Sequence, residues 1–580
     1  MTAEKAARTI PVWVVLPAIL VAVVVAHAAL LRLPYYWDEA GYYIPAAYDF
    51  FRSGALIPYS TLSNAHPPLP SVYLAVWWKV FHFAPAVTRT AMCAVAAVAL
   101  TAVWRLALIT TGKAQVAAAT VLLTGIYPVF FAQSSLAHAD LFAAAGTLWA
   151  LAFFLEERIW LAAICFSLAA LSKETAIVTP LALAVWEVFR IPTSAKTGQK
   201  WGTQGSRRGR IAKETEGSEG FGIPNSAKTG QKWGTRDSWK GRIGSVAALV
   251  APVVPLAGWY AYHWRKTGFV FGNAEYVRYN ATQTLTPVRV LLALAHRTMH
   301  VTAHMNLFVP VAAMLACLLL PVVKEGKGDG DAPLRTRIGF EQQAIFYVTI
   351  AANVVFFSVL GGALLTRYLL PLYPLVLLLC VSTFWRRLRE WTALVALSAA
   401  AFVAGLFVNP PYRFAPEDNL EYVTVIRLHQ AAAGEIVAQM PGATVLTAWP
   451  ATDELTKPEL GYVQQPVRVV AIENFSAEQI AKAANQPEDY SAALVFSTKY
   501  DPPRLWLNLG RRNEELDTRY FDFHRDLPPA MIARALGGRV VWRAERKGQW
   551  VAVLRFARTG PSEASYPDRA TSSATPLASR

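Results

Sequence analysis

Residues 12–31 read VWVVLPAILVAVVVAHAALL, and Tyr35-Tyr36-Trp37-Asp38-Glu39 follows them. A helix needs about 20 apolar residues to cross a bilayer, and this run has that length. It is long for a signal-peptide core and no small-residue cleavage site follows it, so we expect a retained span. The acidic pair then lies at the membrane surface, where a carboxylate can take a proton from a hydroxyl or hold a metal ion. A helix cap is the plainer alternative for this pair.

The composition indicates a membrane protein. The chain has 580 residues, of which 54% are hydrophobic and only 16% charged, whereas soluble domains carry about 25% charged residues. The net charge is +16, and residues 190–242 hold twelve Lys or Arg against four Asp or Glu. A basic run between apolar segments is typical of a cytoplasmic loop, so nucleic-acid binding is not favoured. The cysteines lie inside apolar stretches and are expected to be buried small hydrophobes: Cys93, Cys165, Cys317 and Cys380.

Apolar stretches recur through residues 1–408 and predict a polytopic α-helical membrane domain with about eleven spans. The predicted spans are 12–31, 91–109, 115–133, 138–155, 159–172, 175–189, 245–262, 305–323, 342–360, 366–384 and 391–408. With a cytoplasmic N-terminus, the basic connections all fall on the cytoplasmic side. If the aromatic segment from Leu69 to Phe83 crossed the membrane, the basic loop 190–243 would lie on the outer side. We therefore interpret this segment as an interfacial or half-inserted helix.

The C-terminal part has a different character. Short apolar runs at 443–448, 467–472 and 492–497 predict buried strands, and a helical pattern follows Ser476, a favourable N-cap. Residues 409–559 are therefore predicted to form a small α/β domain, which the span count places outside the cytoplasm.

Two further segments look flexible. The loop 190–243 contains the same short sequence twice, from Ile191 and from Ile223, and is interpreted as a duplicated flexible insert on the cytoplasmic side. Residues 560–580 are rich in Ser, Pro and Ala and are expected to be disordered.

Ionisable residues beside the apolar segments gather on the outer side in this topology. They are Asp38, Glu39, His66, His138, Asp140, Lys173, Glu174 and Arg367, with Tyr368 next to the last. Charged groups near a bilayer are costly unless they are paired or functional. Each alone has a structural explanation: Lys173-Glu174, for example, would serve as an ion-paired turn. A transporter would place such residues near the midplane, whereas these lie at span ends, which favours an enzyme acting at the membrane face.

The order of these motifs resembles the GT-C glycosyltransferases. The similarity is strongest to the dolichyl-phosphate-mannose–protein mannosyltransferase superfamily, which includes the bacterial aminoarabinose transferases of lipid A. It covers about residues 10–410. The motifs that carry it are Asp38-Glu39, His66-Pro67-Pro68-Leu69, the Asp140 turn, Leu171-Ser172-Lys173-Glu174-Thr175 and Thr366-Arg367-Tyr368-Leu369-Leu370-Pro371. His66 stands where the lipid A-modifying relatives commonly have a Glu-Lys pair.

The resemblance implies an inverting transfer of a sugar, hexosyl or pentosyl, from a polyprenyl-phosphate donor to a hydroxyl of a protein, lipid or glycan. Asp38 would be the general base. Arg367 and Lys173 would stabilise the phosphate leaving group, Arg367 best because of its two-pronged guanidinium. Glu39, His66 and Asp140 would position the substrate or support a divalent metal, with Glu39 and His66 as candidate ligands. Glu39 is also a catalytic candidate beside Asp38, and His138, Glu174 and Tyr368 are candidate contacts of the substrate or the donor phosphate.

Further candidate residues and alternative functions remain open beside the glycosyltransferase interpretation. Residues 263–304 are predicted to form an outer loop that covers the site, in which Arg278 is a candidate phosphate contact. A ligase or polymerase of lipid-linked glycans with a similar fold is an alternative, and a transporter is the alternative that is not an enzyme. The compact loops favour a bacterial inner membrane.

Overall fold

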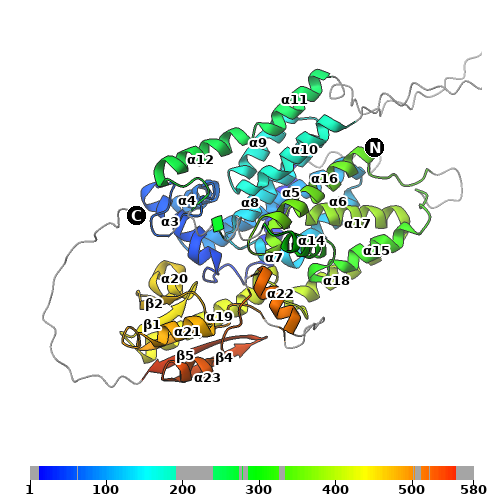
Figure 1. Cartoon of the computed structure of the whole chain (residues 1–580). Coiled ribbons are helices and arrows are strands. Elements are labelled where there is room, and N and C mark those ends of the chain that lie inside the picture. The colour runs from blue at the N-terminus through cyan, green and yellow to red at the C-terminus, as the bar shows by residue number, and fades with distance from the viewer. Residues whose placement is uncertain are drawn as a thin grey trace, which may run out of the picture.

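The computed structural model describes residues 12–61, 63–190, 239–272, 277–278, 285–325, 333–500, 502, 511–521 and 523–556. Helices dominate the part of the chain up to residue 407, and a five-stranded sheet with its helices forms the C-terminal part (Figure 1). The duplicated insert within residues 191–238 and the tail 560–580 lie outside the described residues.

Helices lie where the sequence predicts apolar spans, because a chain in lipid must satisfy its backbone hydrogen bonds internally. They are α2 (Val12–Ala26), α5 (Pro85–Thr111), α6 (Ala114–Ile126), α7 (Pro128–Gln133), α8 (Ala139–Leu155), α9 (Ile159–Ala170), α10 (Val178–Phe189), α11 (Trp239–Val250), α12 (Val253–Thr267), α15 (Phe308–Leu318), α16 (Phe340–Val359), α17 (Tyr373–Arg387) and α18 (Trp391–Phe407). Within the described residues, three helical stretches are long and apolar enough to cross a membrane, and a pair bent by 99° gives a fourth. The predicted number of eleven spans is thus not established by helix length.

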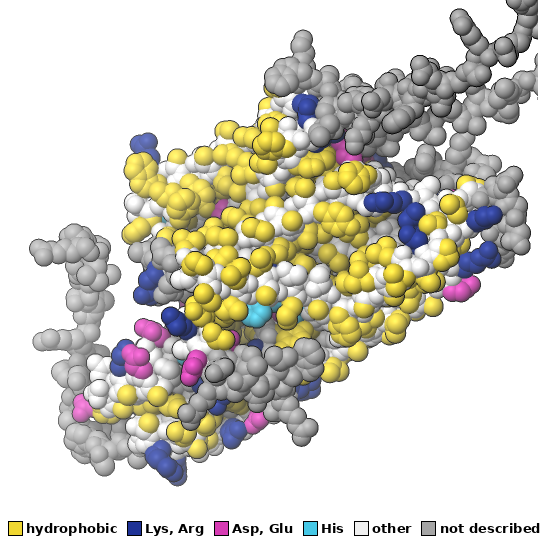
Figure 2. Space-filling view, turned by 45° about the vertical axis from the view of Figure 1, so that its right-hand side comes forward, with side chains coloured by type: hydrophobic (Ala, Val, Ile, Leu, Met, Phe, Trp, Pro, Cys, Tyr) yellow, Lys and Arg dark blue, Asp and Glu magenta, His cyan; other side chains and the backbone are white. Residues whose placement is uncertain are grey.

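The surface of the helical part is suited to lipid. Large apolar side chains point outward on several helices: Leu319 is 89% exposed, Phe189 78% and Val254 73%. Figure 2 shows hydrophobic side chains across most of this face, whereas charged side chains gather over the C-terminal part and at the ends of the helical part. Such a continuous apolar surface would be unfavourable in water, so it indicates burial in a bilayer.

The segment after α2 folds into short helices. A π-helical turn, Glu39–Tyr43, leads into α3 (Ile44–Ser53), which ends at Gly54 with φ of 74°. The next helix, α4 (Leu69–Phe81), has 13 residues and is shorter than the roughly 20 needed for a full crossing. Its length agrees with the predicted interfacial or half-inserted helix.

The prediction of an outer loop at 263–304 is wrong for the second half of that segment, which forms the helix α14 (Pro287–Thr302). The buried face of α14 carries Arg289 and Arg297 beside Ala293 and Val301. These arginines interrupt the apolar periodicity by which a helix is recognised in a sequence. Helix α14 continues through the turn His304–Asn306 into α15, across the 99° bend.

The C-terminal part contains one mixed sheet in the order β2-β1-β3-β5-β4. Strands β1 (Thr444–Ala448), β2 (Arg468–Ile472) and β3 (Ala492–Phe496) are parallel and lie where the sequence predicts them, whereas β4 (Gly538–Arg546) and β5 (Gln549–Phe556) form an antiparallel hairpin that was not predicted. The accompanying helices are α19 (Glu421–Gln439), α20 (Ala451–Thr456), α21 (Ala477–Ala484), α22 (Arg511–Phe521) and α23 (Pro529–Ala535). The predicted N-cap is confirmed, because the Ser476 side chain accepts a hydrogen bond from the Gln479 amide.

The C-terminal part is docked on the segment that carries the acidic pair. The Tyr462 hydroxyl donates to the Tyr35 carbonyl at 2.9 Å, and the Tyr35 amide donates to the Leu460 carbonyl at 3.4 Å. Trp449, just after β1, meets Trp37 edge-on with ring centres 5.3 Å apart. These contacts place the sheet beside Asp38.

Gly41 is required for this docking, and we expect Gly41→Ala to weaken it. A Cβ atom at position 41 would lie 2.6 Å from Cζ2 and 2.7 Å from Cε2 of Trp449, so the indole would have to move. Overpacking of this kind costs about 1–3 kcal/mol. The unfolding temperature of the detergent-purified variant should therefore fall.

Gly434, within α19, provides the matched control for this substitution. A Cβ atom at Gly434 would meet nothing within 4 Å. Gly434→Ala should be neutral, or stabilising by up to about 1 kcal/mol, because alanine favours helix. Equal unfolding temperatures for the two variants would contradict the tight fit of Trp449 on Gly41.

Candidate active site

A cavity of about 1950 Å³ lies between the helical part and the C-terminal sheet. Its walls come from the segment after α2, from α14, from the turns at 361–368 and 408–418, and from one edge of the sheet. The sequence-predicted residues that line it are Asp38, His66, Lys173, Glu174, Arg367 and Tyr368. Segments more than 300 residues apart in the chain therefore meet at one site.

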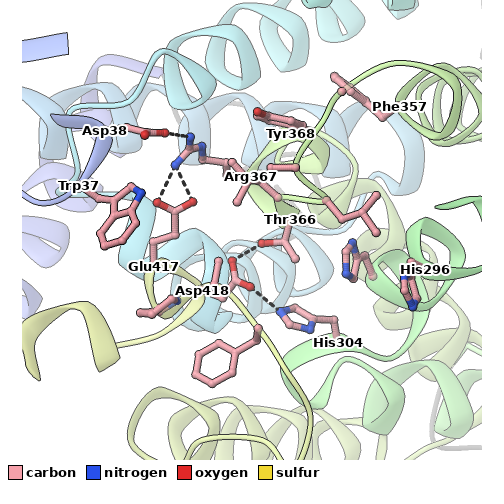
Figure 3. A pocket seen from close by; sticks show the side chains of 18 of the residues that line it. Trp37, Asp38, His296, His304, Phe357, Thr366, Arg367, Tyr368, Glu417 and Asp418 are labelled. Atoms are coloured by element: carbon pink, nitrogen blue, oxygen red, sulfur yellow. Dashed lines mark hydrogen bonds and ion pairs between the residues drawn. The ribbon is translucent and has the colours of Figure 1, made fainter. Parts of the chain in front are cut away.

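Arg367 is the centre of the polar cluster (Figure 3). Its Nη2 donates to Oδ2 of Asp38, and its Nη1 lies 2.5 and 2.6 Å from the two carboxylate oxygens of Glu417. Its Nε lies 3.3 Å from Oδ2 of Asp140. One buried guanidinium thus holds three carboxylates that come from distant parts of the chain. The same planar fork suits a phosphate group.

Lys173 adds a second cation next to this cluster. It lies between α9 and the turn Glu174–Ile177, with Nζ 2.5 Å from Oδ1 of Asp140 and 3.9 Å from the ring centre of Tyr368. The ring face favours the ammonium group by a cation–π interaction. Asp140 therefore bridges Lys173 and Arg367 from behind, since it does not itself line the cavity.

His66 and Glu174 form a hydrogen-bonded pair at the cavity wall, with Nδ1 of His66 2.8 Å from Oε2 of Glu174. Burial pushes the pKa of Glu174 upward, but His66 and Lys173 outweigh burial and hold this pKa below its usual value. Glu174 is thus a charged carboxylate at neutral pH. His66 therefore lies in the cavity wall as the hydrogen-bond partner of Glu174.

Glu417 and Asp418 were missed by the sequence reasoning, although they complete the cluster. They lie in the turn Pro416–Asp418 after α18 and are both buried. Asp418 accepts hydrogen bonds from Thr366 and, at 3.0 Å, from Nε2 of His304. A second acidic pair just after an apolar span repeats the pattern of Asp38-Glu39, and this signal would have found it.

Burial raises the pKa of Glu417 to about 8, although the guanidinium of Arg367 opposes the shift. The neighbouring carboxylates of Asp38 and Asp418 push the pKa in the same direction as burial. Burial and the neighbouring carboxylates therefore favour the protonated form of Glu417 more than in an exposed glutamate. Its contribution to folding stability is complete below the usual carboxyl pKa and is lost as the pH rises through about 8.

Glu39 lies away from the cavity and is fully buried. Its carboxylate oxygens accept from the amides of Tyr36 and Ala137, at 2.8 and 2.6 Å, and Oε2 lies 3.2 Å from Nη2 of Arg89. These contacts fasten the segment after α2 to α5. The geometry therefore supports a structural role for Glu39 instead of the predicted catalytic or metal-binding one.

Two predicted substrate contacts also lie outside the cavity wall. His138 is buried behind Tyr43, with ring centres 5.6 Å apart, and its Nδ1 lies 2.8 Å from Oε1 of Gln133. Arg278 is exposed and does not line the cavity, although its neighbour Val277 does. Neither geometry supports the predicted contact with the donor phosphate.

The loop before Arg367 is held by the two arginines of α14. Nη2 of Arg289 lies 2.6 Å from the Gly361 carbonyl, and Nη1 of Arg297 lies 2.6 Å from the Leu365 carbonyl. These bonds satisfy backbone carbonyls that have no helix or sheet partner. Arg289 and Arg297 therefore position Arg367 through its backbone, a role that the loop interpretation of residues 263–304 concealed.

Among the described residues, no three His, Cys, Asp or Glu side chains form a group that could hold a metal ion. The predicted ligands Glu39 and His66 have separate partners, Arg89 and Glu174. The central carboxylates instead face Arg367 and Lys173. The arrangement offers a carboxylate for proton transfer and cations for a developing negative charge on one wall.

Comparisons with known proteins find one family match and similar solved structures. Residues 65–202, less than half of the chain, match the family model of dolichyl-phosphate-mannose-protein mannosyltransferases. Curated protein sequences give no match. The solved structure of ArnT from Cupriavidus metallidurans bound to undecaprenyl phosphate is similar with a TM-score of 0.50 at 16% identity, over 93% of this chain and 98% of that one.

A second solved structure is more distant. The archaeal oligosaccharyltransferase AglB from Archaeoglobus fulgidus, in complex with an inhibitory peptide and a dolichol-phosphate, gives a TM-score of 0.39 at 12% identity. That match covers 83% of this chain and 69% of that one. Residues 65–202 are thus similar to the dolichyl-phosphate-mannose-protein mannosyltransferase family, and the chain as a whole shares the fold of ArnT.

Proposed function

We propose that the chain is an inverting glycosyltransferase that moves a sugar from a polyprenyl-phosphate donor to an acceptor hydroxyl. The observation that carries this proposal is the direct contact of Arg367 with Asp38 at the wall of the large cavity. A base and a phosphate-binding cation lie side by side there, as a direct displacement at a phosphate-linked sugar requires.

In the proposed reaction, Asp38 takes the proton of the acceptor hydroxyl. The acceptor oxygen forms a bond to the anomeric carbon, and the bond from that carbon to the phosphate oxygen breaks. The electron pair of that bond leaves with the polyprenyl phosphate, whose charge Arg367 and Lys173 would stabilise. A strong general acid is dispensable because phosphate is already a good leaving group.

The apolar part of the cavity supports a lipid-linked donor. Met299, Phe308, Phe356 and Leu360 come from α14, α15 and the end of α16 and line the cavity together. The structure of ArnT that shares this fold contains bound undecaprenyl phosphate. By analogy, the polyprenyl chain would lie against these helices and the phosphate would meet Arg367.

The proposed location is a bacterial inner membrane, with the cavity and the C-terminal domain on the outer side. The basic cytoplasmic loops of the sequence support this orientation. A lipid-linked glycan ligase or polymerase would use the same base and cations, so it differs only in the size of the transferred group. A transporter is disfavoured because the cluster of Arg367, Asp38 and Glu417 is suited to proton and phosphate chemistry.

The test is donor turnover by detergent-purified protein with radiolabelled polyprenyl-phosphate sugars, which carry different hexoses and pentoses. Membrane extract serves as the acceptor source. Release of sugar from one donor by the wild type, but not by Asp38→Asn, would support the proposal and name the sugar. If well-folded wild type turned over no donor, the transfer reaction would be abandoned.

The raised pKa of Glu417 predicts a pH-dependent donor affinity. Glu417 and the donor phosphate would compete for Arg367, and only the charged form of Glu417 competes strongly. Above pH 8 binding then requires proton uptake, so the KM for the donor should rise by up to about tenfold per pH unit. Glu417→Gln should remove this rise, as measured by donor KM between pH 6.5 and 9.

Glu421 supplies the control for this pH dependence. Burial raises the pKa of Glu421 to about 7, and Glu421 does not line the cavity. Glu421→Gln should therefore keep the wild-type rise in donor KM. If Glu417→Gln kept it as well, the competition between Glu417 and the phosphate would be ruled out.

A further inference from the structure

We infer that the acceptor is a saccharide and that it binds at the edge of the C-terminal sheet, on Trp449, Trp37, Ser497 and Gln549. This inference rests on the proposed transfer reaction, since it names the acceptor class for that reaction. It also gives the C-terminal domain a role that the cluster around Arg367 does not explain.

The binding edge follows from the strand topology. Trp449 comes directly after β1 and Ser497 directly after β3, and these strands are parallel. Gln549 begins β5, which is antiparallel to β3, so it lies at the same edge. All three residues line the cavity. The carboxyl ends of parallel strands are the usual ligand-binding edge of such sheets.

Gln549 has a hydrogen-bond donor that the protein does not satisfy. Its side chain is 2% exposed, and Oε1 accepts from the Ser497 hydroxyl at 2.6 Å. Ser497 in turn accepts from the Trp550 amide at 3.1 Å, so its hydroxyl proton is directed to Gln549. Nε2 of Gln549 has no partner. A buried donor without a partner costs about 1–3 kcal/mol, so a ligand oxygen there would be favourable.

Aromatic rings continue this edge toward Asp38. Trp449 contacts Trp37 edge-on and lies 5.5 Å from Tyr42, and each of the three rings is partly exposed and lines the cavity. Trp37 has φ of 46°, a left-handed conformation that is unfavourable for a tryptophan and is found mainly at functional sites. The next residue is Asp38, so a ligand on these rings would reach the proposed base.

The combination of partly exposed aromatic rings with the unsatisfied amide of Gln549 favours a saccharide over a lipid or a peptide. A sugar ring has apolar C–H faces that pack on indole rings, and a rim of hydroxyls that accept from an amide such as that of Gln549. A lipid chain would prefer the apolar wall made by Met299, Phe308 and Leu360. The two kinds of wall would thus separate donor lipid from acceptor glycan, with Asp38 and Arg367 between them.

The experiment measures saccharide binding without requiring turnover. Saturation-transfer NMR on the full chain in detergent would use soluble trisaccharides of glucose, mannose and arabinose as probes. We expect at least one to bind the wild type and to bind Gln549→Met about tenfold more weakly. The unfolding temperature of Gln549→Met should change little. The substitution removes an unsatisfied donor, and the Ser497 hydroxyl, which loses its acceptor on Gln549, can donate to the Trp550 carbonyl 3.4 Å away. Trp449→Phe, which keeps an aromatic ring, should also weaken binding.

Gln479→Met is the matched control, because Gln479 is a buried glutamine of the same domain that does not line the cavity. It should leave trisaccharide binding unchanged. Unaltered binding by both Gln549→Met and Trp449→Phe would overturn the inference. So would binding of a Ser/Thr-rich peptide or of lipid vesicles in place of every trisaccharide.

Donor turnover, measured in parallel, separates this inference from the proposed reaction. Turnover of a polyprenyl-phosphate sugar without any trisaccharide binding would overturn the saccharide acceptor and leave the transferase in place. Trisaccharide binding that depends on Gln549, without turnover of any donor, would support the saccharide site and refute the proposed transfer reaction.

Discussion

Asp38→Asn is expected to lower sugar transfer by about 10²–10⁴-fold, the range that a positioned general base contributes. Asparagine has the same shape as aspartate but cannot take a proton from the acceptor. It also keeps an oxygen that can accept from Arg367, whose guanidinium contacts Oδ2 of Asp38. The KM for the donor should therefore change little, while kcat falls.

Glu39→Gln is the control for this substitution, because it alters the neighbouring carboxylate. Glu39 is buried on Arg89 and does not line the cavity. Breaking a buried ion pair costs about 3–5 kcal/mol, so Glu39→Gln should lower the unfolding temperature. The correctly folded fraction of this variant should retain its kcat. A wild-type kcat in Asp38→Asn would show that another group accepts the proton.

Much of the site was predictable because short motifs fix local chemistry. Asp38, Lys173 and Arg367 were predicted from charges at the ends of apolar spans, and all three line the cavity. Their partners were not predictable in the same way. Glu417 meets Arg367 across 50 residues and Asp38 meets it across 329, and no local pattern specifies such pairings.

Burial also separated residues that look equivalent in the sequence. Asp38 and Glu39 are adjacent, yet the turn Glu39–Tyr43 sends one carboxylate into the cavity and the other onto Arg89. The fold was predicted where apolar periodicity is continuous, as in the spans and the parallel strands. It was missed in α14, because arginines that bind loop carbonyls occupy its buried face.

Arg367→Ala is the second substitution with a large expected effect. It would leave Asp38, Asp140 and Glu417 without the cation that they share. Loss of a single preorganised donor to a developing charge typically costs about 10²–10³ in kcat. We expect a loss of at least this size, together with weaker binding of undecaprenyl phosphate as a product inhibitor.

Folding effects must be separated from this loss, because removing one partner of a buried ion pair costs about 3–5 kcal/mol. The guanidinium of Arg367 lowers the pKa of Glu417, so its removal raises this pKa further, and Glu417 stays protonated over a wider pH range. Arg367→Ala should therefore lose stability only as the pH rises above 8. The double variant Arg367→Ala/Glu417→Gln removes one carboxylate as well. It should regain unfolding temperature at alkaline pH but not sugar transfer.

Arg89 offers a comparison at equal burial. Both arginines are buried and paired with carboxylates, but only Arg367 lines the cavity. Arg89→Lys should therefore lower stability without changing inhibition by undecaprenyl phosphate, whereas Arg367→Lys should weaken inhibition because lysine lacks the planar fork. Equal inhibition constants for wild type and Arg367→Lys would assign the phosphate to another cation, with Lys173 the nearest in the cluster.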